Sequence, residues 1–363
     1  MSMSTPNPPV EYAEYLRLDR LLSSQSPKST ERGSPAHDEM LFIVVHQAYE
    51  LWFKQVLHEL DSVLALFRQD SVDERNIGVA VSRLQRIIEI QKILVEQLRV
   101  LETMTPLDFL DFRDLLVPAS GFQSLQFRLI ENKLGLRPEQ RTPGAASSRL
   151  TPDQCQALAA SEAGPSLFAL VEKWLERTPF LELPGYDFWR SYQAAVDAML
   201  ARDRRTIETN PTLSPTEREE QLAELARTEA SFSALLEEKV HDRLVAEGKR
   251  RLSHRATLAA LFIHLYRDQP ILHLPFRFLT ALVDVDELLA TWRYRHALMV
   301  HRMIGTKIGT GGSSGHHYLL STVERNKVFV DLYNLSTFLI SRSALPALPP
   351  ELERRLGFYY PRE

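Results

Sequence analysis

Apolar side chains recur every three or four residues along most of this chain, and that spacing is typical of α-helices with one buried face. The clearest example runs from Phe42 to Phe67, and a second stretch repeats the pattern from Val81 to Leu101. Glycine, which destabilises helix interiors, contributes only 14 of the 363 residues. The sequence therefore predicts an all-α fold. The short polar link between the two stretches predicts that they pack antiparallel.

Further helical segments are separated by prolines and glycines. Residues 136–152 carry three prolines and show no periodicity, so we expect a surface loop or an insertion there. No internal repeat or composition shift divides the chain, so we expect one domain over residues 1–363, with a helical excursion over 136–240. The expected segments are a short helix and turn over 108–121, a helix over 122–135 closed by Gly135, helices over 166–177, 190–207, 215–246 and 251–268, a helix over 276–305 broken near 284–286, and a last helix over 326–341.

Composition excludes several classes of protein. A net charge of -4 argues against a broad nucleic-acid surface. Cys155 is the only cysteine, which excludes an internal disulfide, a cysteine-ligated zinc site and an iron–sulfur cluster, and favours a reducing compartment. The longest stretch without acidic or basic side chains, 308–323, is too short and too rich in glycine and serine to span a membrane. The N-terminus has neither a signal-peptide nor a transit-peptide pattern, so we expect a cytoplasmic protein.

Two of the eleven histidines, His46 and His296, lie on apolar faces of predicted helices. Standard hydrolase motifs such as HExxH and GxSxG are missing from the sequence. Each histidine could be a hydrogen-bonded core residue. A single histidine on an apolar helix also suits the proximal ligand of a haem, because the porphyrin supplies the other four nitrogens. His301 has an equally apolar context, so periodicity does not choose among these histidines.

Two other features could bind a small ligand. Arg113 lies among apolar residues, so its partner is either a neighbouring carboxylate, from Asp111 or Asp114, or the carboxylate or phosphate of a ligand. The glycine-rich segment 309–315, GTGGSSG, follows a predicted helix and lacks the lysine of a nucleotide-binding P-loop. It is either a plain surface loop or a loop that closes over a small polar or zwitterionic molecule.

Five long segments, taken together and in order, resemble the tryptophan 2,3-dioxygenase family. The resemblance covers about residues 12–342. It implies an all-helical, homotetrameric enzyme with b-type haem. Such an enzyme adds O₂ across the indole C2–C3 bond of L-tryptophan and produces N-formyl-L-kynurenine, the first step of the kynurenine pathway. The segments are HDEMLFIVVHQAYELWFKQVLHELDSV, LETMTPLDFLDFRDLLVPASGFQSLQFRLIENKLG, WLERTP, WRYRHALMVHRMIGTKIGTGGSSGHHYL and VFVDLYNLSTFLI.

Matching these segments residue by residue implies roles for the pocket residues. His296, in RYRHALMV, corresponds to the axial haem ligand of the family. His46, in HQAYELW, corresponds to the histidine that meets the indole N–H, and Phe42 packs on the indole. Arg113 corresponds to the partner of the substrate carboxylate, and Thr310 to the residue that contacts the ammonium and carboxylate groups.

The resemblance also implies roles at the edges of the pocket. Ser120 and Gly121 correspond to positions at the haem edge, and Tyr12 and Tyr15 to tyrosines of a neighbouring subunit, so that segment 1–35 would cover that subunit's site. Phe109 stands beside the substrate, where some bacterial members have tyrosine. Two alternatives stay open at this point: a haem enzyme for another aromatic substrate, and a non-catalytic haem or tryptophan sensor.

Overall fold

The computed structural model describes residues 9–140, 150–179, 187–307, 309 and 315–358 of the chain. These residues form α-helices, short 3-10 helices and connecting segments, and no strand occurs among them. The prediction of an all-α fold is confirmed. A membrane-spanning helix is also absent from this described part, where no helix combines the required length with enough apolar residues.

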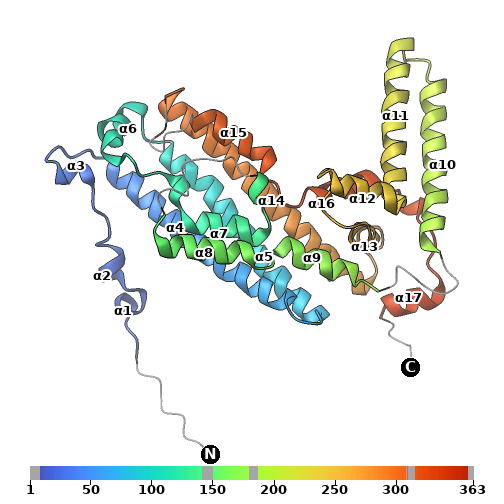
Figure 1. Ribbon diagram of the computed structural model, residues 1–363, viewed down its shortest axis with the longest axis horizontal. Coiled ribbons are helices and arrows are strands. Elements are labelled where there is room, and N and C mark those ends of the chain that lie inside the picture. The colour runs from blue at the N-terminus through green and yellow to red at the C-terminus, as the bar shows by residue number, and fades with distance from the viewer. Residues whose placement is uncertain (1–8, 141–149, 180–186, 308, 310–314, 359–363) are drawn as a thin grey trace, which may run out of the picture.

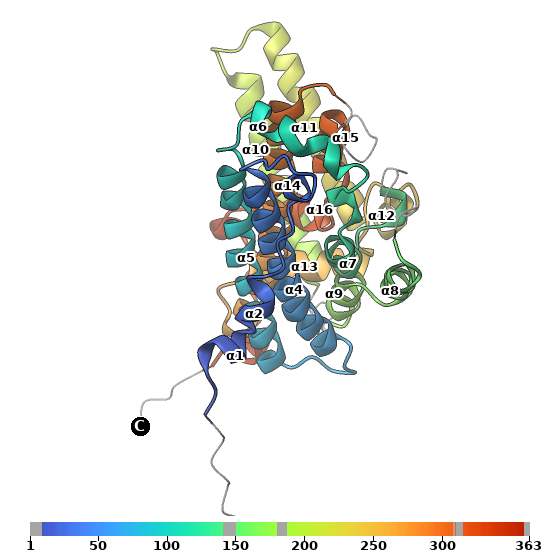
Figure 2. The ribbon, with the colours of Figure 1, turned by 90° about the vertical axis from the view of Figure 1, so that its left-hand side faces the viewer.

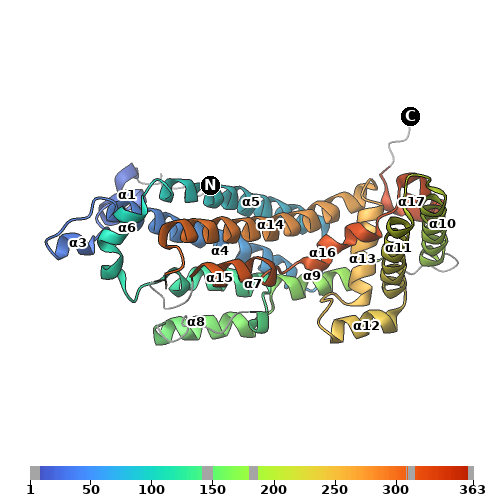
Figure 3. The same cartoon turned by 90° about the horizontal axis from the view of Figure 1, so that it is seen from above.

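Three long helices, α4 (Glu39–Phe67), α5 (Glu74–Leu101) and α14 (Pro270–Ile304), lie side by side along the body of the molecule (Figures 1 and 3). The apolar stripes of α4 and α5 face each other, so Leu60 and Leu84 are completely buried. Asp73 begins α5, because its carboxylate accepts a 2.8 Å hydrogen bond from the N–H of Asn76. The link between the two helices is short, and they pack antiparallel as predicted.

Helix α7 (Leu125–Leu134) packs against α4, and α15 (Gly315–Arg325) packs against α14. The hydroxyl of Ser124 accepts a hydrogen bond from the third N–H of α7, at Phe127. Gly135 ends α7 with φ +116°, a left-handed conformation that side chains other than glycine rarely adopt. A Cβ at this position would lie 2.7 Å from the Cβ of Phe168. The predicted helix closed by Gly135 is confirmed.

Of the remaining helices, α8 (Pro152–Ala163) packs beside α7 and α9 (Leu167–Glu176) beside α4 along the body, and the others lie at its two ends (Figures 1 and 3). At one end, α10 and α11 form a hairpin that projects away from the bundle (Figures 1 and 2). The helices at this end and beside it are α10 (Phe188–Thr209), α11 (Pro215–Leu236), α12 (Glu238–Ala246), α13 (His254–Leu265), α16 (Val330–Asn334) and α17 (Pro350–Leu356). At the other end lie α1 (Tyr12–Leu16), α2 (Leu18–Leu21), α3 (Lys28–Glu31) and α6 (Pro106–Arg113).

The predicted break near residues 284–286 is wrong, because α14 continues without interruption from Pro270 to Ile304. Asp286 lies in the middle of this helix and is 1% exposed. Its carboxylate accepts hydrogen bonds from the backbone N–H groups of Val328 and Phe329, both at 2.9 Å. These donors lie more than forty residues later in the chain. Asp286 therefore does not break the helix but anchors the segment that follows α15.

Three other details of the helices differ from the sequence prediction. The segment 326–341 is not one helix, because α16 passes into a 3-10 helix at Leu335–Phe338. The segment 215–246 divides at Glu237, whose backbone is extended. Helix α8 was not predicted, although Thr151 and Gln154 form a reciprocal capping box at its start. Within the predicted loop 136–152, residues 141–149 lie outside the described part of the chain.

Candidate active site

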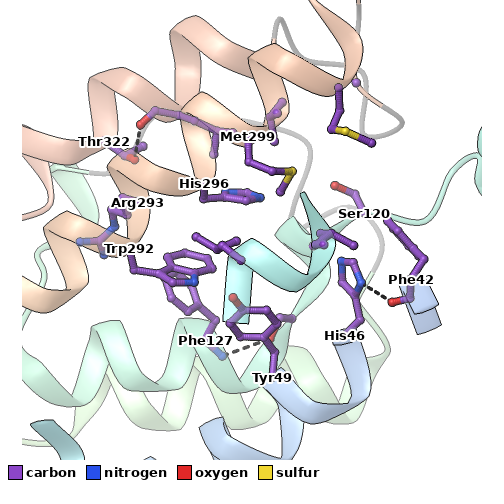
Figure 4. Close-up of a pocket in the computed structure, with 18 of the residues that line it drawn as sticks. Phe42, His46, Tyr49, Ser120, Phe127, Trp292, Arg293, His296, Met299 and Thr322 are labelled. Atoms are coloured by element: carbon purple, nitrogen blue, oxygen red, sulfur yellow. Dashed lines mark hydrogen bonds between the residues drawn. The ribbon is translucent and has the colours of Figure 1, made fainter. Parts of the chain in front are cut away.

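A cavity opens between α4, α6, α7, α14 and α15, and most of its lining is apolar (Figure 4). Its volume is about 280 Å³, many times the roughly 10–15 Å³ that one water molecule requires. The cavity therefore has the size and character of a small-molecule site. The helices deliver side chains to it at helical spacing: Phe42, His46, Tyr49 and Phe53 from α4, and Trp292, His296, Met299 and Met303 from α14.

His296 and His46 line this cavity from opposite helices (Figure 4). The indole of Trp292 stacks on the His296 ring, with 5.1 Å between ring centroids and 12° between the planes. The Nδ1 atom of His296 is buried and has no hydrogen-bond partner among the described residues. Burial, together with the nearby His46, lowers the pKa of His296 to about 4. The ring is therefore neutral at physiological pH, which is the form that binds a metal ion.

His46 has a fixed tautomer, because its Nδ1 lies 2.7 Å from the carbonyl oxygen of Phe42 one turn earlier. A carbonyl oxygen only accepts hydrogen bonds, so Nδ1 carries the proton and Nε2 keeps a free lone pair in the neutral ring. Burial lowers the pKa of His46, which favours this neutral form. The ring is exposed to the cavity rather than enclosed in the core, so the core interpretation of His46 is wrong.

Aromatic side chains surround His46. The Phe42 ring lies 4.1 Å from the His46 ring, centroid to centroid, and 5.7 Å from the ring of Phe109 on α6. Tyr49 donates a 2.7 Å hydrogen bond to the carbonyl of Leu94, and burial raises the pKa of Tyr49 to about 12. The tyrosine therefore acts as a neutral, immobile part of the wall. This region offers a flat apolar surface next to one hydrogen-bond acceptor, Nε2 of His46.

Arg113, the last residue of α6, brings a positive charge to the same cavity. Its side chain is 17% exposed, and Nη1 lies 3.5 Å from a carboxylate oxygen of Asp114. The Asp114 side chain is 87% exposed, so water competes strongly for this ion pair. The sequence left two partners open for Arg113, a neighbouring aspartate or a ligand. In the structure the guanidinium has a weak carboxylate neighbour and also faces the ligand cavity. Ser120 and Gly121 also line the cavity.

A buried ion-pair network forms part of the cavity wall. Arg293, one turn before His296, donates a 2.8 Å hydrogen bond to Glu131 of α7, and both side chains are almost fully buried. Arg128 donates to the other carboxylate oxygen of Glu131 at 3.0 Å. Sequence reasoning missed this network, because α7 and α14 are distant in the chain. Helical spacing from His46 and His296 could have identified Tyr49 and Trp292.

Three residues predicted for the site are not placed in it. Tyr12 and Tyr15 lie on α1, outside the cavity lining, and both are 75% exposed. Thr310 lies outside the described residues, although its neighbour Gly309 lines the cavity. The described structure thus brings together Phe42, His46, Phe109, Arg113, Ser120, Gly121 and His296.

The donor set of the cavity suits a haem better than a bare metal ion. Among the residues that the structure describes, no group of three or more His, Cys, Asp or Glu side chains could hold a metal ion. A haem brings four nitrogen ligands of its own, so it requires only one further ligand from the protein. His296 offers a neutral imidazole in an apolar surrounding, which fits that requirement.

Comparison with known proteins agrees with this geometry. The family model for tryptophan 2,3-dioxygenase matches residues 3–339. Tryptophan 2,3-dioxygenase of Bdellovibrio bacteriovorus is 53% identical, over 97% of this chain and 99% of its own length. Proteins of the same name from Dictyostelium discoideum and Xenopus tropicalis are 50% and 51% identical, over 96% and 95% of this chain and 88% and 86% of their own lengths. The chain therefore belongs to the tryptophan 2,3-dioxygenase family.

Proposed function

We propose that the cavity holds one b-type haem, with His296 as its axial ligand, and that L-tryptophan binds on the His46 side. The chain is an oxidoreductase that adds O₂ to L-tryptophan and yields N-formyl-L-kynurenine. One observation supports the placement of the cofactor above all others: a neutral, half-buried imidazole faces an apolar cavity that a second histidine enters from the opposite helix. Ser120 and Gly121 would then lie at the haem edge.

Haem, when bound, would supply the activation of O₂, and the protein would bind and orient the substrate and exclude water. The apolar rings of Phe42 and Phe109 provide the surface on which an indole can lie. Nε2 of His46 accepts the hydrogen bond of the indole N–H, because the Phe42 carbonyl already holds the proton on Nδ1. His46 thereby fixes the angle of the ring in the cavity.

Arg113 binds the other end of the amino acid. A guanidinium forms two parallel hydrogen bonds with a carboxylate, which fixes direction as well as supplying charge. The exposed Asp114 releases it at little cost, because water solvates the freed carboxylate. Thr310 would contact the ammonium and carboxylate groups from the glycine-rich segment, in line with the family resemblance.

We also propose that four copies assemble and that residues 1–363 form one helical domain in each. Tyr12 and Tyr15 would then enter the pocket of a neighbouring subunit, which agrees with their exposure in the single chain. The lone cysteine, Cys155, is an exposed free thiol, and this supports a reducing, cytoplasmic location.

The decisive experiment compares the purified protein with its His296→Ala variant after expression with a haem precursor. We expect the wild type to carry b-type haem and to form N-formylkynurenine from L-tryptophan and air. The variant should lose haem and activity and keep its helical circular dichroism. A His301→Ala variant is the control, because His301 lies outside the cavity lining. Haem retained in His296→Ala and lost in His301→Ala would reassign the ligand.

A further inference from the structure

Two histidines that take no part in the reaction contact each other between α14 and α15. His301 lies in the last turn of α14, and His316 is the second residue of α15. Their ring centroids are 4.2 Å apart, and the ring planes are nearly perpendicular at 80°. His317 is adjacent, with its ring 5.6 Å from that of His316. None of these histidines lines the cavity, so the site is separate from the proposed haem position.

The Nδ1 atom of His316 is buried and has no hydrogen-bond partner among the described residues. A buried polar atom without a partner carries a free-energy penalty, so such atoms require an explanation. Burial and the neighbouring His301 and His317 lower the pKa of His316. The ring is therefore neutral at physiological pH, and an imidazole in this form has a lone pair for a metal ion.

The two rings are close enough for one ion to bridge them after a side-chain rotation. With Zn–N bonds of about 2.0–2.1 Å and a tetrahedral angle at the ion, two imidazoles on one zinc ion place their ring centroids roughly 5.2 Å apart. The observed 4.2 Å is shorter, so the two rings must move apart to share an ion. His301 is the more exposed of the two side chains, so an outward rotation of its ring would provide this separation.

We propose that His301 and His316 together bind one divalent transition-metal ion, with Zn²⁺ as the best match for two imidazole ligands. The described residues offer no group of three such ligands, so water molecules complete the coordination. The bound ion links the C-terminal turn of α14 to the first turn of α15. Both helices also supply cavity residues, among them Met303 and Leu319, so the ion joins two walls of the active site from outside.

The test titrates Zn²⁺ into the full-length holoenzyme, without a histidine tag, by isothermal calorimetry. We expect one ion per chain. The variants His301→Gln and His316→Gln should each weaken zinc binding at least about tenfold. Loss of a residue that only hydrogen-bonds to a metal ligand already lowers metal affinity by about this factor, and here a ligand itself is lost. The double variant should lose little more than either single variant, because both side chains serve one ion.

Matched controls keep the result interpretable. His58 is exposed on α4, so His58→Gln should bind zinc as tightly as the wild type. The haem spectrum should stay unchanged during the titration, which excludes zinc binding in the haem cavity. Circular dichroism without zinc checks that each variant is folded. Absence of zinc binding to the wild type would overturn the proposal, as would equal binding by wild type, His301→Gln and His316→Gln.

Discussion

A single backbone carbonyl sets the chemistry of His46. Because the Phe42 carbonyl oxygen holds the proton on Nδ1, the nitrogen available to a ligand is an acceptor as long as the ring is neutral. The same ring protonated would present an N–H and repel the indole N–H. The lowered pKa of His46 therefore matters for binding, because it keeps the acceptor form present at neutral pH.

His46→Leu should consequently cause a modest loss of activity with L-tryptophan. One neutral hydrogen bond contributes about 0.5–1.5 kcal/mol, so we expect kcat/KM to fall roughly 2- to 12-fold. The matched substrate is 1-methyl-L-tryptophan, which has no indole N–H to donate. Its turnover by wild type and variant, measured side by side, should be similar. A loss of several orders of magnitude with L-tryptophan would instead assign proton transfer to His46.

At the scale of helices, the sequence predicts most of the bundle. The prediction is wrong where a residue distant in the chain determines the local structure. The stripes of α4 and α5 are visible because each is periodic over many turns. Asp286 was misread because its hydrogen-bond donors, at Val328 and Phe329, follow the helix end by many residues. Periodicity likewise left His296 and His301 equivalent. The family resemblance selects His296, and the fold agrees by placing His296 in a cavity and His301 against His316.

The link between α7 and α14 depends on one buried carboxylate. Glu131 accepts hydrogen bonds from both Arg293 and Arg128, and it is 2% exposed. Glu131→Gln removes the charge and leaves a buried guanidinium without its ionic partner, which typically costs about 3–5 kcal/mol. We expect the urea midpoint of the variant to fall accordingly. Glu96→Gln, in an exposed pair with Arg99, is the control and should change the free energy of unfolding by less than about 0.5 kcal/mol.

The junction between α12 and α13 should make stability depend on pH. His241 is completely buried; its Nε2–H donates to the Leu252 carbonyl, and Arg250 donates to its Nδ1. Burial is the main cause that lowers the pKa of His241, and the positive charge of Arg250 lowers it further. The unfolded chain therefore binds a proton near pH 6.5 that the folded chain rejects. The stabilisation from neutral His241 is complete above this pH and declines as the pH falls toward the lowered pKa.

Urea unfolding at pH 7.5 and pH 5.5 checks this sign. Between pH 6.5, the pKa of histidine in the unfolded chain, and pH 5.5, His241 can lower the free energy of unfolding by at most about 1.4 kcal/mol. The wild type should lose about 1 kcal/mol more of its free energy of unfolding between the two pH values than His241→Gln. Contributions of the other histidines cancel in this comparison. Equal losses in the two proteins would show that His241 takes up its proton without hindrance in the folded state.

At the scale of the whole molecule, the N-terminal segment divides into an anchored part and an unpacked part. Glu39 is buried and accepts hydrogen bonds from the backbone N–H groups of Lys28 and Ser29, and Gln25 bonds to Gln47 of α4. Helices α1 and α2 contain no buried residue and lie beside the bundle (Figure 1). Tyr12, Tyr15 and Leu22 leave large apolar surfaces exposed, as expected for a segment that packs on another subunit.

A truncated chain that begins at Ser23 tests this division, because it removes α1 and α2 and keeps every anchoring contact of residues 25–39. We expect the truncated chain to fold and to show normal helical circular dichroism, since the removed residues contribute nothing to the core. It should lose activity through an incomplete pocket, with or without dissociation of the proposed tetramer, as followed by analytical ultracentrifugation. Tyr12→Ser/Tyr15→Ser in the full chain should reproduce the loss of activity. A truncated protein that stays tetrameric and fully active would exclude any role of this segment in a neighbouring site.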